Sequence, residues 1–189
     1  MRIVCGVAII LIAALVFGRY LISRFSLWVK LRILCRTNGF RLRPAGAFWW
    51  LRRLNTKACD FHIETDRAVY SVKLIGFLSK KNMLVFFDER RFSRKNMSFQ
   101  FFWTAFTIPF KAQSFPRYDF RYGGDAPKSK EHIPCYVFCP RVLKITKKVG
   151  DVSVPGMAWE LSSGERLGKI TLFRSSRSFL AALRTPKDV

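Results

Sequence analysis

The feature that most constrains this chain is its N-terminal stretch, because residues 3–18 contain no charged side chain. Extended to residue 23, the stretch has about 21 residues and would measure roughly 31 Å as an α-helix, close to the ~30 Å hydrocarbon core of a bilayer. Arg19 lies near its end, where a long side chain can reach the headgroups. The sequence therefore predicts a transmembrane anchor over residues 1–24.

Basic residues follow the apolar stretch and predict its orientation. The positive-inside rule places such a flank in the cytoplasm and the N-terminus outside; the flanking residues are Arg19, Arg24, Lys30, Arg32 and Arg36. A juxtamembrane basic helix over 25–39 is expected to follow, with Gly39 as its stop signal.

The alternative is a cleaved signal peptide and a secreted protein. Arg2 and the apolar core suit that alternative, but no A-x-A-like cleavage site precedes Arg19.

The formal net charge of +22 arises from 34 basic and 12 acidic residues, and it is unevenly distributed. Residues 1–54 contain ten Lys and Arg and no Asp or Glu, whereas residues 55–189 contain 24 basic and 12 acidic residues. A cation near an anionic bilayer gains on the order of 1 kcal/mol, so anionic lipid is the expected partner. Nucleic acid is the alternative polyanion, because a basic domain binds it without sequence specificity.

Residues 40–189 are expected to form one basic α+β domain built mainly of antiparallel strands, with a C-terminal helix. A hairpin is predicted from strands at 59–64 and 68–76 around a turn at 65–67. Further strands are expected at 83–87, at 97–106 and, in short pieces, from 135 to 173, and the helix is expected at 175–184. Residues 109–134 are rich in Pro, Gly, Asp and Lys and are expected to form a long exposed loop.

The residues expected to contact lipid or another polyanion are basic. They lie beside the predicted anchor, shortly after it, and in a polar turn at 88–96; they are Arg19, Arg24, Arg36, Arg52, Arg53, Arg90, Arg91, Arg94 and Lys95. Trp28 and Trp49 are expected at headgroup level, where amphipathic rings gather. Nucleic-acid binding would in addition need exposed aromatic side chains for base stacking, such as Phe99, Phe101 or Trp103.

The five cysteines are an odd number, and one lies inside the predicted anchor, so reduced thiols are expected. Loss of Cys5 with a signal peptide would leave four cysteines, which allow three disulfide pairings.

Residues of zinc-ligand type are present, but strand geometry opposes a zinc site. Cys59 and His62 would point to opposite faces if they shared a strand. His132 precedes Cys135 and Cys139, and the two thiols would lie about 13 Å apart along a strand. No metal and no cofactor are therefore expected.

The order of Asp60, Glu64 and Lys73 resembles the arrangement in metal-dependent nucleases of the PD-(D/E)xK type. Ser71 stands two residues before the lysine, where that motif requires an acid, so Glu64 would have to supply the second carboxylate. No nucleophile elbow, P-loop or dinucleotide-binding glycine motif is present. No catalytic residue is therefore predicted, and the sequence favours a protein that is not an enzyme.

Together these features predict a single-pass membrane protein whose basic cytoplasmic domain lies on an anionic membrane as a non-catalytic interaction or scaffold module. A protein partner would fit a scaffold role. A membrane-tethered nucleic-acid-binding module is the first alternative, and a nuclease-like enzyme using Asp60, Glu64 and Lys73 is the second.

Overall fold

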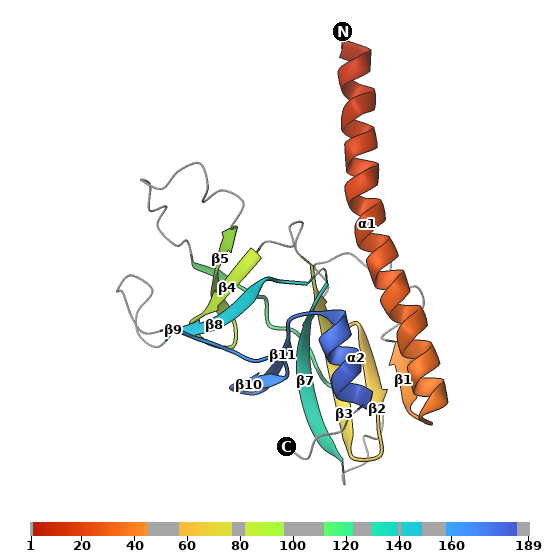
Figure 1. Cartoon of the computed structure of the whole chain (residues 1–189), viewed down its shortest axis with the longest axis vertical. Coiled ribbons are helices and arrows are strands. Elements are labelled where there is room, and N and C mark those ends of the chain that lie inside the picture. Colours follow the sequence, from red (N-terminus) through yellow and green to blue (C-terminus); the bar gives the residue numbers. More distant parts are fainter. Residues whose placement is uncertain are drawn as a thin grey trace.

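The computed structural model describes residues 2–44, 57–76, 82–96, 112–122, 130–139, 141–148 and 158–184, with the backbone alone for 2–17 and for 19, 20, 82, 95, 96, 112 and 158. In this part of the chain a long helix comes first, eleven strands follow, and a short helix comes last (Figure 1). The elements are α1 (Arg2–Thr37), β1 (Arg41–Pro44), β2 (Phe61–Glu64), β3 (Ala68–Ile75), β4 (Asn82–Phe86), β5 (Arg91–Asn96), β6 (Ala112–Ser114), β7 (Glu131–Phe138), β8 (Lys144–Lys148), β9 (Ala158–Glu160), β10 (Glu165–Leu167), β11 (Ile170–Phe173) and α2 (Ser176–Arg184).

The strands form two mixed sheets. The six-stranded sheet has the order β1-β2-β3-β7-β11-β10, and the five-stranded sheet has the order β6-β5-β4-β8-β9. β7 lies parallel to both β3 and β11, and β4 lies parallel to β8. Six of the nine pairings between these strands are antiparallel, but the three parallel pairings, which involve the central strands, were not predicted. Parallel neighbours are far apart in the sequence, so the hairpin signals that predict antiparallel pairs do not reveal them.

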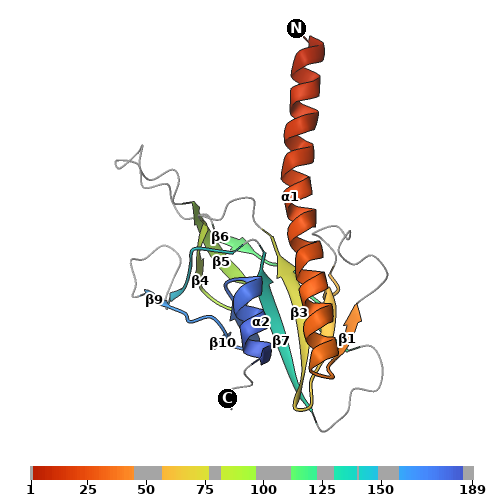
Figure 2. The ribbon, with the colours of Figure 1, turned by 45° about the vertical axis from the view of Figure 1, so that its right-hand side comes forward.

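Two hydrophobic clusters hold the layers together. On one face of the six-stranded sheet, α1 and α2 pack against its apolar side chains (Figures 1 and 2). This helix-side cluster includes Leu27, Leu31 and Leu34 of α1 and Phe179 and Leu183 of α2. The opposite face packs against the five-stranded sheet through a second cluster, whose largest members include Phe86, Phe92, Phe115, Tyr136 and Phe138.

The predicted transmembrane anchor is wrong. In the part of the chain that the structure describes, no helix is both long enough and apolar enough to cross a bilayer. Beyond residue 18, α1 carries basic side chains, and Leu27, Leu31 and Leu34 are buried against the sheet. The segment predicted as a separate juxtamembrane helix is part of α1 and packs against the sheet. The single-pass topology was deduced from the transmembrane anchor, so that prediction is wrong as well.

Local sequence signals place the ends of the helices well. Gly39 has a φ of 69°, and the Phe40 N–H donates to the Cys35 carbonyl (2.8 Å), which closes α1 with a left-handed residue. The Ser175 hydroxyl accepts a hydrogen bond from the Ser178 N–H (3.1 Å) and caps α2. The C-terminal helix predicted at 175–184 is thereby confirmed.

The predicted hairpin is also confirmed, because β2 and β3 pair antiparallel around the turn at 65–67. The predicted loop at 109–134 is only partly a loop, since it contains β6 and the start of β7. Parts of it acquire order from distant partners: the bridge between Ala58 and Asp119 is one example. The strand predicted at 97–106 lies outside the described residues.

Replacement of Leu31 by Ala tests whether α1 is part of the core. Leu31 is fully buried in the helix-side cluster, so Leu31→Ala should lower the free energy of unfolding by about 2–5 kcal/mol. Ile33 on the same helix is 62% exposed, and Ile33→Ala should change stability far less. Urea denaturation of both variants measures the difference. Equal effects would show that α1 does not pack as described.

Candidate anion-binding surface and polar cluster

A buried charge cluster joins α1 to the six-stranded sheet. Arg24 Nη2 lies 2.6 Å from Asp60 Oδ1, and Lys73 Nζ lies 3.8 Å from Asp60 Oδ2. Asp60 Oδ2 also accepts the Leu74 N–H (2.8 Å), and Lys73 donates to the Ala58 carbonyl (2.8 Å). None of the three charged residues is more than 2% exposed. Arg24 therefore cannot reach a lipid headgroup, contrary to the role predicted for it, and instead anchors α1.

The residues of the nuclease-like pattern do not converge. Asp60 and Lys73 belong to the buried charge cluster, whereas Glu64 lies at the other end of β2. Glu64 accepts hydrogen bonds from Lys130 (3.0 Å) and Tyr122 (3.3 Å), and the Lys130 bond lowers the pKa of the Glu64 carboxyl. Among the side chains described, no three His, Cys, Asp or Glu lie close enough together to hold a metal ion.

A hydrogen-bonded chain of four side chains, which we call the polar chain, runs inward from the surface. The exposed His132 places Nε2 2.6 Å from Ser71 Oγ, which lies 2.7 Å from His62 Nδ1. His62 Nε2 in turn lies 3.1 Å from Cys59 Sγ. Cys59 and His62 meet because Cys59 precedes β2, so the strand alternation assumed in the zinc argument does not apply to it.

The chemistry of the polar chain is that of a satisfied interior network. Burial, followed by the charge of Asp60, raises the pKa of the Cys59 thiol to about 11, so the thiol is neutral near pH 7. Ser71 is fully buried, which closes its hydroxyl to a substrate. Burial, followed by His132 and Arg43, lowers the pKa of His62. These environments favour stable neutral groups over an activated nucleophile.

The sequence contained part of the signal for this network. His62 and Ser71 are cross-strand partners in the hairpin that the sequence predicted. His132 could not be placed beside them, because β7 joins β3 by a long-range parallel pairing. Tyr122 packs beside this network. The centre of its ring lies 5.1 Å from the centre of the His62 ring and 5.2 Å from Cζ of the Arg43 guanidinium.

The four cysteines whose side chains the structure describes, Cys35, Cys59, Cys135 and Cys139, are free and buried. They lie in the interior as small apolar or weakly polar groups.

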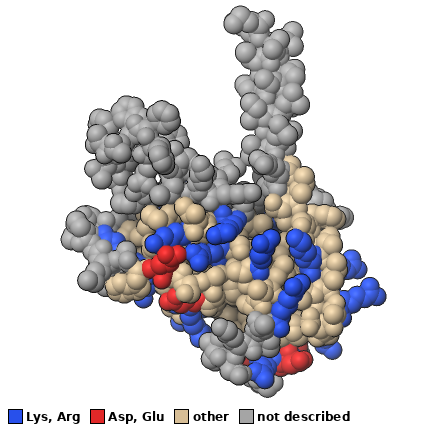
Figure 3. Space-filling view, in the orientation of Figure 1, with Lys and Arg blue, Asp and Glu red and all other residues tan. Residues whose placement is uncertain are grey.

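The predicted polyanion contacts do not gather on one face. Arg36 is exposed on α1, on one side of the six-stranded sheet. Arg90, Arg91 and Arg94 lie at β5, in the sheet that covers the other side; Arg90 donates to the Phe115 carbonyl (3.3 Å) and Arg91 pairs with Asp88. On the face that Figure 3 shows, blue Lys and Arg side chains cover more of the surface than red Asp and Glu side chains.

Several predicted residues cannot be compared with the structure. Arg52, Arg53 and Trp49 lie outside the described residues, as do the aromatic side chains at 99–103, and the side chains of Arg19 and Lys95 are likewise not described. Trp28 is half-buried and packs against the helix-side cluster, which gives it a contact within the domain.

The second half of α1 has an apolar side that does not pack on the sheet. Ile22, Phe25, Val29 and Ile33 are 68%, 50%, 39% and 62% exposed, and their spacing of three or four residues aligns them along the helix. We call these four the outer stripe. Three basic residues are exposed beside it, and we call them the outer cations: Lys30, Arg32 and Arg36. The sequence analysis missed this arrangement because α1 is apolar on two opposite sides, and only packing shows which side is covered.

Removal of the buried carboxylate tests the charge cluster. Asp60→Asn removes the carboxylate that lies beside the buried Arg24 and Lys73, which should lower the free energy of unfolding by about 3–5 kcal/mol. Glu160→Gln is the control, because Glu160 forms exposed ion pairs with Lys144 and Arg174 and should matter much less. Denaturant unfolding would contradict the cluster's role if both variants lost the same stability.

The lowered pKa of His62 predicts a loss of stability in acid. Near pH 8 His62 is neutral in both states; below its ordinary value of 6.5, the unfolded chain binds the proton first. The free energy of unfolding should therefore fall as the pH decreases from about 6.5 toward the lower pKa of the folded state. His62→Gln removes this contribution, so its urea midpoint should depend less on pH between 7.5 and 5. A slope equal to that of the wild type would argue against a buried neutral His62.

Comparison with known proteins gives no relative from which a role could be transferred: no protein-family model, no curated protein and no solved structure matches the chain.

Proposed function

We propose that this protein is a non-catalytic interaction module that lies on an anionic phospholipid surface and is held there by the outer cations of α1. The observation that carries this proposal is the exposure of Lys30, Arg32 and Arg36 on a helix within a region, residues 1–54, that contains no acidic residue. No transmembrane segment is part of the proposal.

The ion pairs of five other basic side chains support the choice of α1. Arg91, Arg121, Lys144, Arg166 and Arg174 each have a carboxylate within 4 Å, which offsets part of their charge. Within the described part of the chain, no carboxylate is within that distance of an outer cation. Each cation near an anionic surface contributes on the order of 1 kcal/mol, so three together give useful but salt-sensitive binding.

The interior chemistry supports binding over catalysis. The charged groups that could act in a reaction, Asp60 and Lys73, neutralise each other in the buried charge cluster. Ser71 and Cys59 are also buried, and the Cys59 thiol is neutral near pH 7. A protein partner would fit a scaffold role, but no described surface identifies one.

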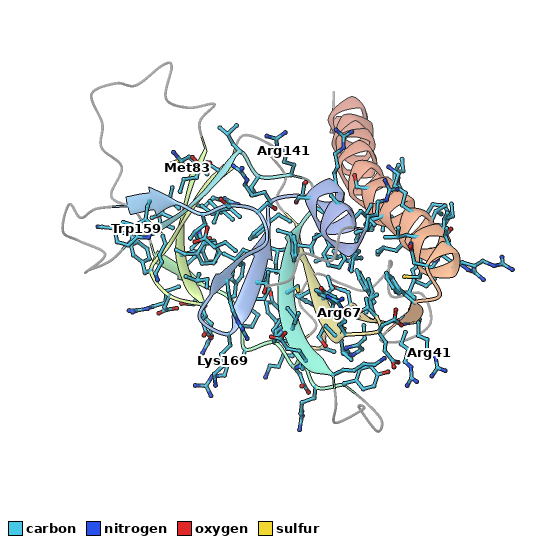
Figure 4. All side chains as sticks on the ribbon, turned by 60° about the horizontal axis from the view of Figure 1, so that its bottom comes forward. Arg41, Arg67, Met83, Arg141, Trp159 and Lys169 are labelled. Carbon is cyan, nitrogen blue, oxygen red and sulfur yellow. The ribbon has the colours of Figure 1, made fainter. Side chains whose placement is uncertain are left out.

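Charge reversal on α1 tests the proposal with the full-length protein. Arg32→Glu/Arg36→Glu should weaken binding to phosphatidylcholine vesicles that contain phosphatidylserine by at least tenfold at low salt, because two attractions become repulsions. The matched control is Arg117→Glu/Arg141→Glu, which changes the net charge equally at exposed sites elsewhere (Arg141, Figure 4) and should weaken binding much less. Co-sedimentation measures the bound fraction.

Three results would contradict the proposal. The wild type could fail to bind anionic vesicles, it could bind vesicles of pure phosphatidylcholine equally well, or the two double variants could lose the same affinity. Fluorescence anisotropy with a single-stranded oligonucleotide is measured in parallel. Binding to the oligonucleotide without binding to vesicles would make nucleic acid the polyanion and overturn the lipid proposal.

A further inference from the structure

The outer stripe contains four of the six large apolar side chains that are exposed on the described surface. Its four side chains are each between 39% and 68% exposed, whereas Leu27, Leu31 and Leu34 on the reverse of the same helix are buried. Single exposed apolar residues are ordinary, but an aligned row of four indicates a surface that another apolar phase covers.

We infer that α1 lies in the plane of the membrane interface, with the outer stripe inserted at the boundary between headgroups and acyl chains. This inference rests on the proposed function, to which it adds a second, apolar mode of attachment. At 3.6 residues per turn, Lys30 lies on one flank of the stripe and Arg32 on the other. An apolar row between cationic flanks is the arrangement of helices that lie in an interface, since the long basic side chains reach the phosphates while the apolar side chains insert.

The buried charge cluster keeps the outer stripe facing outward. Arg24 lies on the opposite side of α1 from the stripe, and its guanidinium is 2.6 Å from the Asp60 carboxylate. Leu27 and Leu31, on the same side as Arg24, pack in the helix-side cluster. α1 therefore cannot rotate about its axis to hide the stripe without breaking a buried ion pair. A stripe held in its binding orientation before the lipid arrives loses little conformational freedom on binding.

Charge and chemistry favour phospholipid over the other possible occupants. A second copy of α1 packed on the stripe would bring the three outer cations close to an identical set, with no acidic residue in this part of either chain to separate them. Nucleic acid would satisfy the cations, but three of the four stripe residues, Ile22, Val29 and Ile33, are aliphatic, and Phe25 is the one stripe residue with a ring for base stacking. Toward its N-terminus, α1 continues through residues 3–18 without a charge, which extends the apolar character of the helix.

The test separates the two modes of attachment by salt. Full-length protein is floated with phosphatidylcholine–phosphatidylserine vesicles at low salt and at about 1 M salt, where the Debye length is ~3 Å and charge attraction is largely screened. The variant Ile22→Ser/Val29→Ser/Ile33→Ser changes only exposed side chains. It should keep most low-salt binding and lose at least tenfold of the binding that remains at high salt. The control Leu143→Ser/Trp159→Ser removes apolar side chains of similar exposure elsewhere (Trp159 on β9, Figure 4) and should bind as the wild type.

A second measurement reports insertion directly. An environment-sensitive fluorophore at Ile33→Cys, in a Cys5→Ser background because the other four cysteines are buried, should shift its emission to the blue on anionic vesicles. The same label at Lys169→Cys, in the turn between β10 and β11, should not shift.

Each outcome decides between the proposals. Absence of low-salt binding by the wild type overturns the proposed function itself. Low-salt binding that disappears completely at high salt, with no emission shift at position 33, leaves the electrostatic proposal intact and overturns insertion. High-salt binding that the serine variant retains in full also overturns the assignment of insertion to the outer stripe.

Discussion

The placement of α1 depends on one buried carboxylate. Asp60 pairs with Arg24 from the helix and with Lys73 from β3, and all three side chains lie in the interior. Removing Asp60 would take away the carboxylate that both buried cations contact, in a medium that solvates charge poorly, so both cations must be placed beside it. The cluster thus fixes both the position and the rotation of the helix. Leu31 and its apolar neighbours supply the area of contact, but area alone does not specify which side of an apolar helix faces the sheet.

This constraint links the interior of the domain to its proposed surface. Cys59, the inner end of the polar chain, precedes Asp60 directly in the sequence, so the polar chain and the charge cluster share one short segment before β2. Backbone hydrogen bonds join the same segment to Asp119. Tyr122, three residues further along the chain, thereby comes to lie against the ring of His62. The outer stripe and the outer cations lie on the side of α1 that faces away from the sheet, where they are exposed. The proposed attachment to lipid depends on this orientation of the helix.

Sequence reasoning was most successful where the determining contacts are local. The hairpin of β2 and β3 follows from alternation around a three-residue turn, and α2 follows from the apolar stripe that includes Phe179 and Leu183. It failed where distant segments pair, because the parallel neighbours of β7 leave no short-range pattern. It also failed for the first helix: an apolar run of suitable length predicted a transmembrane anchor, whereas the structure has one continuous helix whose second half packs against the sheet.

By itself, the sequence determined the charge asymmetry, the absence of acidic residues before position 55 and the local hairpin and helix signals, because these depend on residue type and near neighbours. Only the tertiary structure decided the roles of individual side chains. Arg24 and Arg36 are both basic residues of α1, yet one is buried against Asp60 and the other is exposed. The reason is physical: solvation and the identity of the charge partner determine what a basic side chain can do, and both depend on which distant residues the fold brings beside it.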